Sequence, residues 1–269
     1  MKSFFNTLLF CCFAVFLFGQ QFITPGENYY DDGKGIVYNK EFSVFAKFHT
    51  HGFAMGVNVG TLKTYYLTRF LNFELGELRH IKEFKQSRDL QPISNRVSRA
   101  YTFGKQNNLF VLRGGFGEKR YLTEKAKRRG LAVGLSYELG PSLGLLKPYY
   151  LELVRNQETN GGPTAPFIRS EKYSPENERL FLDFTRIYGS SGFSKGLGEL
   201  SLIPGAQAKF AVHFDWGAFD EFVKAVEAGV MVDFFFQEPS IMVVTAASDV
   251  QNSPLFLNLY INLQFGKRW

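Results

Sequence analysis

The sequence predicts an all-β fold: a closed antiparallel transmembrane β-barrel of 8 or 10 strands with one amphipathic helix in a long loop. Three observations predict this fold. Segments of about ten residues alternate between large apolar residues and small or polar ones, and a tilted membrane strand needs roughly 9–11 residues. Their polar faces carry charges beside Gly, Ala, Asn and Ser, and aromatic residues gather near the segment ends. The content of 30 Phe, 13 Tyr and 26 Gly also suits strands and turns.

Nine segments qualify as strands. The most regular lie at 53–60, 65–76, 131–140, 208–215, 226–235 and 255–265, and less regular ones at 41–48, 108–117 and 145–153. A closed single-chain bacterial barrel has an even number of strands. Eight or ten are therefore expected, with a lean toward ten through a further strand within 77–103 or 197–204.

The charged faces distinguish a membrane barrel from a soluble β-sandwich, which would also alternate. In a barrel the apolar faces contact lipid and the polar faces point inward. The inward charges are Lys47, Glu74, Glu138, Glu152, Lys209, Glu227 and Asp233. Because both signs occur, we expect a closed, salt-bridged interior in preference to an ion-selective pore. The lumen polar network is expected to contain Glu74, Glu138, Lys209, His213, Glu227 and Asp233.

The first twenty residues have the pattern of a secretory signal peptide. A positive start at Lys2 precedes an apolar stretch from Leu8 to Phe18 and the small residue Gly19. We expect a signal at 1–20 and the barrel at 21–269. The cysteines at positions 11 and 12 both lie within the signal, so the exported chain is expected to have neither disulfides nor thiolate metal sites.

The connections divide into short and long ones. Tight turns are expected at 49–52, 140–142 and 215–221, and long loops at 78–99 and about 155–203. In the second long loop, residues 174–189 predict one amphipathic helix, with Ser174 as its cap, Pro175 at its first position and Gly189 at its end. Such a helix would plug the barrel, lie at the membrane surface or dock on a partner.

Two histidine pairings have both a chemical and a structural interpretation. His49 and His51 resemble a metal pair, but no carboxylate lies beside them and a hairpin turn explains them better. His213 and Asp215 share an inward face, yet no Ser pairs with a His on sequence grounds. An interior hydrogen-bond network is the favoured interpretation of that pair. We expect no enzymatic activity, no cofactor and no metal.

A basic segment follows the strand candidate at 108–117. Residues 118–130 hold six Lys and Arg against two Glu. Its cations at 119–129 would meet anionic lipid or an acidic protein, although a solvated charged turn is the favoured interpretation. The overall charge of +6 is mild, and export argues against a nucleic-acid partner.

The chain resembles a group of poorly characterised outer-membrane β-barrel proteins of Bacteroidota. The stretches that carry the resemblance are "FHTHGFAMG", "FGKQNNLFVLRGGFGEKRYL", "GLLKPYYLEL", "IPGAQAKFAVHF", "AVEAGVMVDFF" and "YINLQFGKRW". The resemblance implies an integral protein of the outer membrane of a Gram-negative cell, in contact with outer-membrane lipid. It also implies that the last strand carries the signal read by the barrel-assembly machinery, with Tyr260, Leu263, Phe265 and Trp269 as its residues.

The last strand is expected to pair with the first and close the barrel. Phe265 would mark the lipid edge, with Lys267, Arg268 and Trp269 at the interface on the periplasmic side. The expected role is a small non-enzymatic barrel, a structural or accessory subunit of an envelope assembly, secretion or transport complex with envelope protein partners. The alternatives are a narrow pore or solute channel, and a barrel enzyme that acts on lipid or protein.

Overall fold

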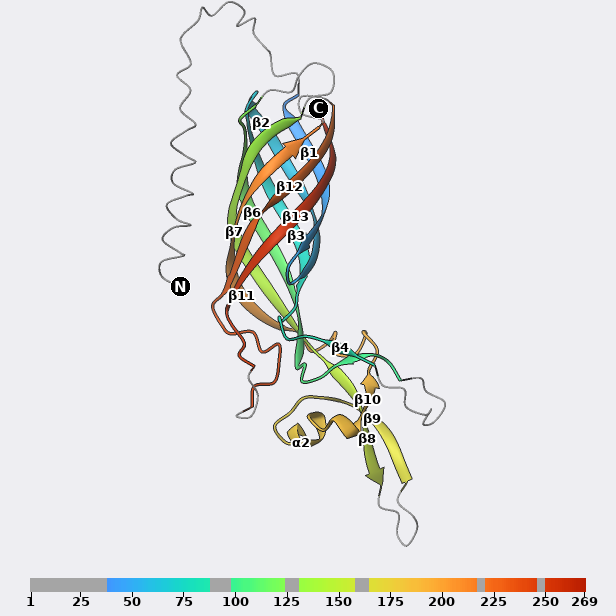
Figure 1. Ribbon diagram of the computed structural model, residues 1–269. Coiled ribbons are helices and arrows are strands. Elements are labelled where there is room, and N and C mark those ends of the chain that lie inside the picture. The colour runs from blue at the N-terminus through green and yellow to red at the C-terminus, as the bar shows by residue number, and fades with distance from the viewer. Residues whose placement is uncertain (1–37, 88–97, 124–130, 158–164, 217–220, 246–249) are drawn as a thin grey trace, which may run out of the picture. The chain divides into compact units, whose positions relative to one another are not determined.

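Eight antiparallel strands form a closed barrel in a computed structural model of the chain (Figure 1). The structure describes residues 38–87, 98–123, 131–157, 165–216, 221–245 and 250–269. The barrel strands are β1 (Lys40–His49), β2 (Gly52–Thr64), β3 (Leu67–Leu78), β6 (Asn107–Tyr121), β7 (Ala132–Pro148), β11 (Ser201–Asp215), β12 (Phe222–Phe235) and β13 (Leu255–Arg268). The predicted closed antiparallel barrel is confirmed, with eight strands and not ten.

The first and last barrel strands close the barrel. In Figure 1, β13 (red) lies beside β1 (blue), and the two pair from Glu41↔Arg268 to His49↔Tyr260. Backbone hydrogen bonds extend this pairing, because Lys40 N donates to the Trp269 carbonyl and Trp269 N donates to the Lys40 carbonyl at 2.9 and 3.0 Å. The closure predicted from the alternating C-terminal segment is thus confirmed.

The surplus strand candidate, 145–153, spans two different elements. β7 continues to Pro148, and the next strand, β8 (Tyr150–Gln157), lies outside the barrel. The tight turn expected at 140–142 is wrong, because β7 runs straight through it. A proline is tolerated in a strand where the ladder is broken, and Gly114 and Gly115 of β6 have no pairing partner in β7 at this point. A side chain at Gly140 would place its Cβ 2.0 Å from the Gly114 carbonyl oxygen, so this strand crossing requires glycine.

Polarity across the barrel wall is inverted relative to a soluble protein. On β13 the outward residues Leu257, Leu259, Ile261 and Phe265 are 55–63% exposed, whereas the inward Asn258 and Asn262 are buried. The other strands follow the same rule, with apolar residues outside and charged or small residues inside. Among the described residues, no helix is long and apolar enough to cross a membrane.

The long connections all leave the barrel at the end opposite Lys40 and Trp269, as strand alternation requires. They form a second set of elements that we call the loop lobe, residues 79–106, 149–200 and 236–254 where described. It contains β8, β9 (Ala165–Lys172) and β10 (Ile187–Ser190) in one sheet of order β10-β8-β9, and a small sheet of β4 (Lys85–Gln86) and β5 (Tyr101–Thr102). One apolar cluster joins all three connections through Tyr101, Leu151 and Val243.

The predicted amphipathic helix is much shorter than expected. Only α2 (Glu178–Phe181) is α-helical, followed by the 3₁₀ turn η1 (Phe184–Arg186) and then β10. Asp183 ends the helical run, because its carboxylate accepts a hydrogen bond from Thr185 N at 2.9 Å and caps the next turn. The apolar residues read as a helix face pack instead in the loop-lobe core, where Phe181 and Ile187 are fully buried.

Candidate functional site

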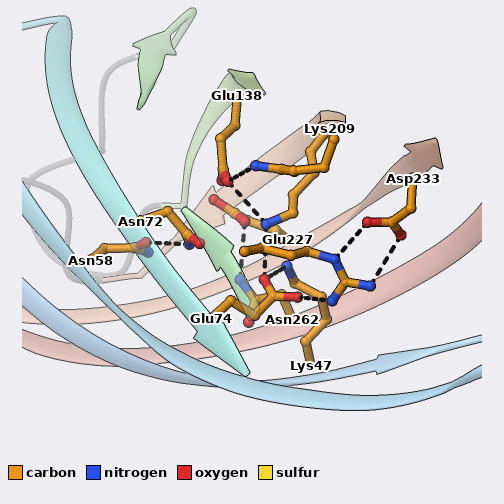
Figure 2. Close-up of polar contacts among 11 residues, drawn as sticks. Lys47, Asn58, Asn72, Glu74, Glu138, Lys209, Glu227, Asp233 and Asn262 are labelled. Carbon is orange, nitrogen blue, oxygen red and sulfur yellow. Dashed lines mark hydrogen bonds and ion pairs between the residues drawn. The ribbon is translucent and has the colours of Figure 1, made fainter. Parts of the chain in front are cut away.

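The centre of the barrel holds an ion network organised around Glu74 of β3 (Figure 2). Lys47 of β1 donates to its carboxylate, and so does Lys209 of β11 at 2.8 Å. Arg113 Nη1 of β6 donates to Glu74 at 2.7 Å. The same guanidinium binds both carboxylate oxygens of Asp233, at 2.7 and 3.0 Å. Glu74 therefore links its own strand, β3, to β1, β6 and β11, and Asp233 links β12 to the network through Arg113.

The network extends to β7 through Glu138. Lys209 Nζ donates to Glu138 Oε1 at 3.0 Å, and Gln207 Nε2 donates to the same oxygen at 2.7 Å. Asn72 and Asn58 add a neutral hydrogen bond of 2.7 Å on the neighbouring strands (Figure 2). With three cations and three carboxylates, the central network is electrically balanced, which a buried cluster needs to be stable.

A second network lies at the end of the barrel where Lys40 pairs with Trp269, and it is built on Arg268. Arg268 Nε donates to Glu41 at 2.9 Å, and Nη2 donates to Asp215 at 2.8 Å. Tyr121 OH also donates to Asp215 at 2.8 Å, and Lys119 Nζ lies 3.3 Å from Glu41. Arg268 was expected at the membrane interface, and that prediction is wrong: its side chain is 2% exposed inside the barrel. Strand alternation continues past Gly266 and turns the penultimate residue inward.

The residues around Arg268 lie where the alternation places them. Lys267 faces outward and pairs with Glu221 at 2.9 Å. Leu263, Phe265 and Trp269 are outward and 38–60% exposed. Tyr260 is inward and 5% exposed, within 4.8 Å of Lys47 Nζ as measured to the ring centroid. The four residues of the predicted assembly signal therefore do not share one face.

His213 belongs to the interior network and is enclosed by it. Its Nδ1 lies 2.9 Å from Glu227 Oε1, and its Nε2 lies 3.9 Å from Asp215. Asn262 donates to the other oxygen of Glu227 at 3.1 Å. The exposed fraction of His213 is 1%, so the ring is shielded from solvent. His49 is also buried in the interior, while His51 lies in the Thr50–His51 turn, where the sequence predicted a hairpin.

An apolar plug closes the interior at the loop-lobe end. Ile241 and Met242, which connect β12 to β13, pack against inward residues of the barrel strands and are 0% and 5% exposed. The strand residues of this plug are Leu78, Leu109, Val111, Leu146, Ile203, Phe235 and Phe256. The described interior thus changes along its length from ion pairs to packed hydrocarbon.

The six residues predicted for the lumen network all lie inside the barrel. Glu74, Glu138, Lys209, His213, Glu227 and Asp233 are 0–7% exposed. Glu152, also expected inside, is not there. It lies on β8 in the loop lobe, opposite Ser170 of β9. The prediction for Glu152 is wrong because the segment 145–153 is not one strand: β7 ends at Pro148 and β8 begins at Tyr150. The described residues contain no group of three or more His, Cys, Asp or Glu side chains that would hold a metal ion.

The sequence interpretation missed two of the most important cations, Arg113 and Lys119. Both follow Leu109 and Val111 on the inward face of β6. Because those two belong to the apolar plug, the inward face of β6 begins apolar and obscures the polar alternation. Gly115 and Gly117 lie on the same inward face of β6, and these small residues after Arg113 are the sequence signal that marks the face as inward.

In the loop lobe, one ion pair fastens β8 to β9. Arg155 Nε and Nη2 donate to the two oxygens of Glu171 at 2.7 and 2.8 Å, and Asn177 Nδ2 donates at 3.2 Å. Partial burial raises the pKa of the Glu171 carboxyl, but the hydrogen bonds from Arg155 and Asn177 outweigh it, so that the pKa lies below its usual value of 4.5. The Glu171 carboxylate is therefore more strongly held in the folded lobe than in an unfolded chain.

Comparisons with known proteins add little beyond the fold. No protein-family model matches the chain, and no curated protein matches it. Among solved structures, the chain is similar to the N-terminal β-barrel domain of Pseudomonas aeruginosa OprF, with 10% sequence identity and a TM-score of 0.31. That match covers 85% of this chain and 98% of the other.

Proposed function

We propose that this chain is an integral outer-membrane β-barrel that neither conducts nor catalyses, and that it serves as a structural or accessory subunit of an envelope complex. The complex would be an assembly, secretion or transport machine, with the loop lobe as the attachment surface. The observation that carries the proposal is the inverted barrel: its outer wall is apolar and exposed, while its interior is filled by balanced ion pairs and an apolar plug.

Membrane placement rests on the outer wall. Large apolar side chains such as Phe73, Leu139 and Leu259 are 57–71% exposed, and they recur on every barrel strand. A surface of this kind is costly in water and suits lipid. The resemblance of the sequence to Bacteroidota outer-membrane barrels supports the same address.

A closed interior argues against the two alternative functions. A channel needs a polar, water-filled path, whereas here Ile241, Met242 and the buried Arg113 occupy the described interior. An enzyme needs an accessible nucleophile or base, and His213 with Asp215 is sealed from solvent. The lumen network accordingly acts as the barrel's packing.

The free edge of β9 supports an attachment role for the loop lobe. β9 pairs with β8 on one side, and no described strand pairs with its other side. An edge strand with open backbone groups is a template for a partner's strand. Phe167, at 38% exposure, and the cation Arg169 lie on this strand.

Three measurements test the proposal, two on membrane-extracted protein and one in native membranes. Membrane-extracted protein is expected to migrate differently on a gel before and after boiling, as folded barrels do, and to give no current steps in planar bilayers. A Phe167→Cys variant is expected to crosslink to a specific envelope protein in native membranes, while Lys63→Cys, at the other end of the barrel, does not. Soluble protein without heat-modifiable migration would refute membrane integration, steady currents would establish a pore, and equal crosslinking by both variants would remove the attachment role.

A further inference from the structure

A cleft opens on the outward face of the barrel where the strands meet the loop lobe. Its volume is about 710 Å³. The floor comes from the outward ends of four neighbouring strands, through Phe53 of β2, Glu77 of β3, Phe110 of β6 and Lys147 of β7. The loop lobe supplies the other walls, including the segment at 190–195. The cleft is therefore separate from the closed lumen.

Positive charge dominates the cleft. Six cations line it, namely Arg79, Lys85, Arg99, Lys105, Lys147 and Lys195, against two carboxylates, Glu77 and Glu83. Both carboxylates are already neutralised, because Arg79 donates to Glu77 at 2.7 Å and Lys105 pairs with Glu83. Four cations remain whose charge has no carboxylate partner among the described residues. Such a cluster attracts an anion.

Lys147 is the centre of this charge. The residue is 3% exposed, and no described carboxylate or hydrogen-bond acceptor pairs with its ammonium; the charged neighbour that acts on it is another cation, Lys105. The ring of Phe193 lies against the ammonium, with its centroid 3.9 Å from Nζ. A cation–π contact is worth only about 0.5–2 kcal/mol, and it leaves the charge of Lys147 without an anionic partner at the wall of the cleft. An unpaired ammonium in a basic cleft favours a negatively charged ligand.

The position of Lys147 along β7 identifies the kind of ligand. The outward residues of β7 run from Val133 to Leu145 before Lys147. Twelve residues of strand cover about 40 Å, or about 28 Å along the membrane normal at a tilt near 45°. That distance equals the hydrocarbon thickness of a bilayer, about 30 Å. Lys147 therefore stands one step beyond the hydrocarbon, at the level of lipid headgroups.

Apolar side chains surround the cleft as a lipid-binding rim requires. Phe53 and Phe193 line it and are 44% and 65% exposed. Leu197 and Leu200, which follow Phe193, are 49% and 43% exposed. A site for a free ion would need none of this apolar surface, whereas a lipid brings acyl chains that cover it.

We infer that this cleft binds the phosphate of a membrane lipid headgroup, with Lys147 as its principal cation and the outer barrel wall against its acyl chains. The site rests on the proposed membrane placement and gives the barrel a fixed lipid at its outer rim. Bound phosphate would give the Lys147 ammonium an anionic hydrogen-bond partner, which the uncharged Phe193 ring cannot supply.

The test uses the refolded full chain in nonionic detergent, with its folding verified by heat-modifiable migration. Native mass spectrometry then measures retention of phosphatidic acid, with diacylglycerol and inorganic phosphate as the two comparison ligands. One phosphatidic acid per barrel is expected, with little retention of diacylglycerol. Lys147→Gln should weaken binding by about tenfold or more, because one charge-assisted contact is lost. The matched control, Lys224→Gln, removes an exposed outward lysine at the other end of the barrel and should change nothing.

The outcomes separate the site from the membrane placement. Equal loss of binding in Lys147→Gln and Lys224→Gln, or none in either, overturns the site while leaving the barrel intact. Inorganic phosphate that displaces the lipid would make this a free-anion site and overturn the lipid assignment. Failure of the wild-type chain to show heat-modifiable migration overturns the membrane placement and the lipid site together.

Discussion

Replacing Glu74 by Gln removes the negative charge on which the central network depends. Three cations share Glu74, but they do not depend on it equally. Arg113 keeps Asp233, and Lys209 keeps Glu138. Lys47, 2% exposed, is left with no described carboxylate, only the rings of Phe45 and Tyr260. Glu74→Gln is therefore expected to destabilise the barrel by about 3–5 kcal/mol, the range for removing one partner of a buried ion pair.

The same geometry predicts which second substitution compensates. Lys47→Met removes the orphaned ammonium and keeps its aliphatic bulk, so the double variant should recover about 1–3 kcal/mol relative to Glu74→Gln alone. The free energy of unfolding is measured for the wild type, the two single variants and the double variant. The assay is urea unfolding of the refolded protein in phospholipid vesicles, followed by tryptophan fluorescence and by heat-modifiable migration. Glu221→Gln, which breaks an exposed pair with Lys267, is the control and should cost about 1 kcal/mol or less.

The result that refutes this reasoning is additivity. If the free-energy changes of Glu74→Gln and Lys47→Met sum to that of the double variant within about 0.5 kcal/mol, the two groups are not coupled. The dependence of Lys47 on Glu74 would then be wrong, even though the two side chains lie in contact.

Three further perturbations have defined outcomes. Gly115→Ala places a Cβ 2.2 Å from Glu138 Oε1. This overpacking should lower the free energy of unfolding in urea by about 1–3 kcal/mol, and an unchanged unfolding midpoint would show that Glu138 moves aside at no cost. Ile241→Ala leaves a cavity in the plug and should cost about 2–5 kcal/mol without current in planar bilayers, and current steps would mean that the plug alone seals the lumen. Because the pKa of Glu171 is lowered by folding, its stabilising contribution is complete above pH 4.5 and is lost as pH falls through the lower folded value. Corrected for intrinsic exchange, the hydrogen-exchange protection of β8 and β9 should fall as pH is lowered from about 5 to about 3, and Glu171→Gln should abolish this pH dependence.

The barrel was predictable because the lipid-facing alternation depends on local sequence. On β13 every outward residue from Leu255 to Phe265 is large and apolar and every inward residue from Asn258 to Gln264 is polar or aromatic, so one period-two pattern places all of them. The same rule placed His213 and Asp233 inside. The pattern failed at Pro141, where turn-forming residues lie within a strand because a broken ladder tolerates them.

The site could be predicted only in part, since ion pairing is a long-range property. Glu74 and Lys209 are 135 residues apart in sequence, and no local pattern pairs them. Arg113 was hidden behind the apolar start of β6, and the cleft around Lys147 was not predictable at all, because it depends on the return of the segment near Phe193 to the barrel wall. The predicted signal segment at 1–20, and most of the basic segment at 119–129, lie outside the described residues.

The position of Arg268 bears on how the barrel is completed. Its partners Glu41 and Asp215 lie 227 and 53 residues away along the chain. A sheet that lacked β13 would leave both carboxylates without this guanidinium, so partly assembled forms lack the ion pairs of the second network that Arg268 makes. Contacts of such high sequence separation slow folding and make it cooperative. We therefore expect barrel formation to be close to all-or-none, with the last strand supplying the final share of stability and no long-lived open intermediate.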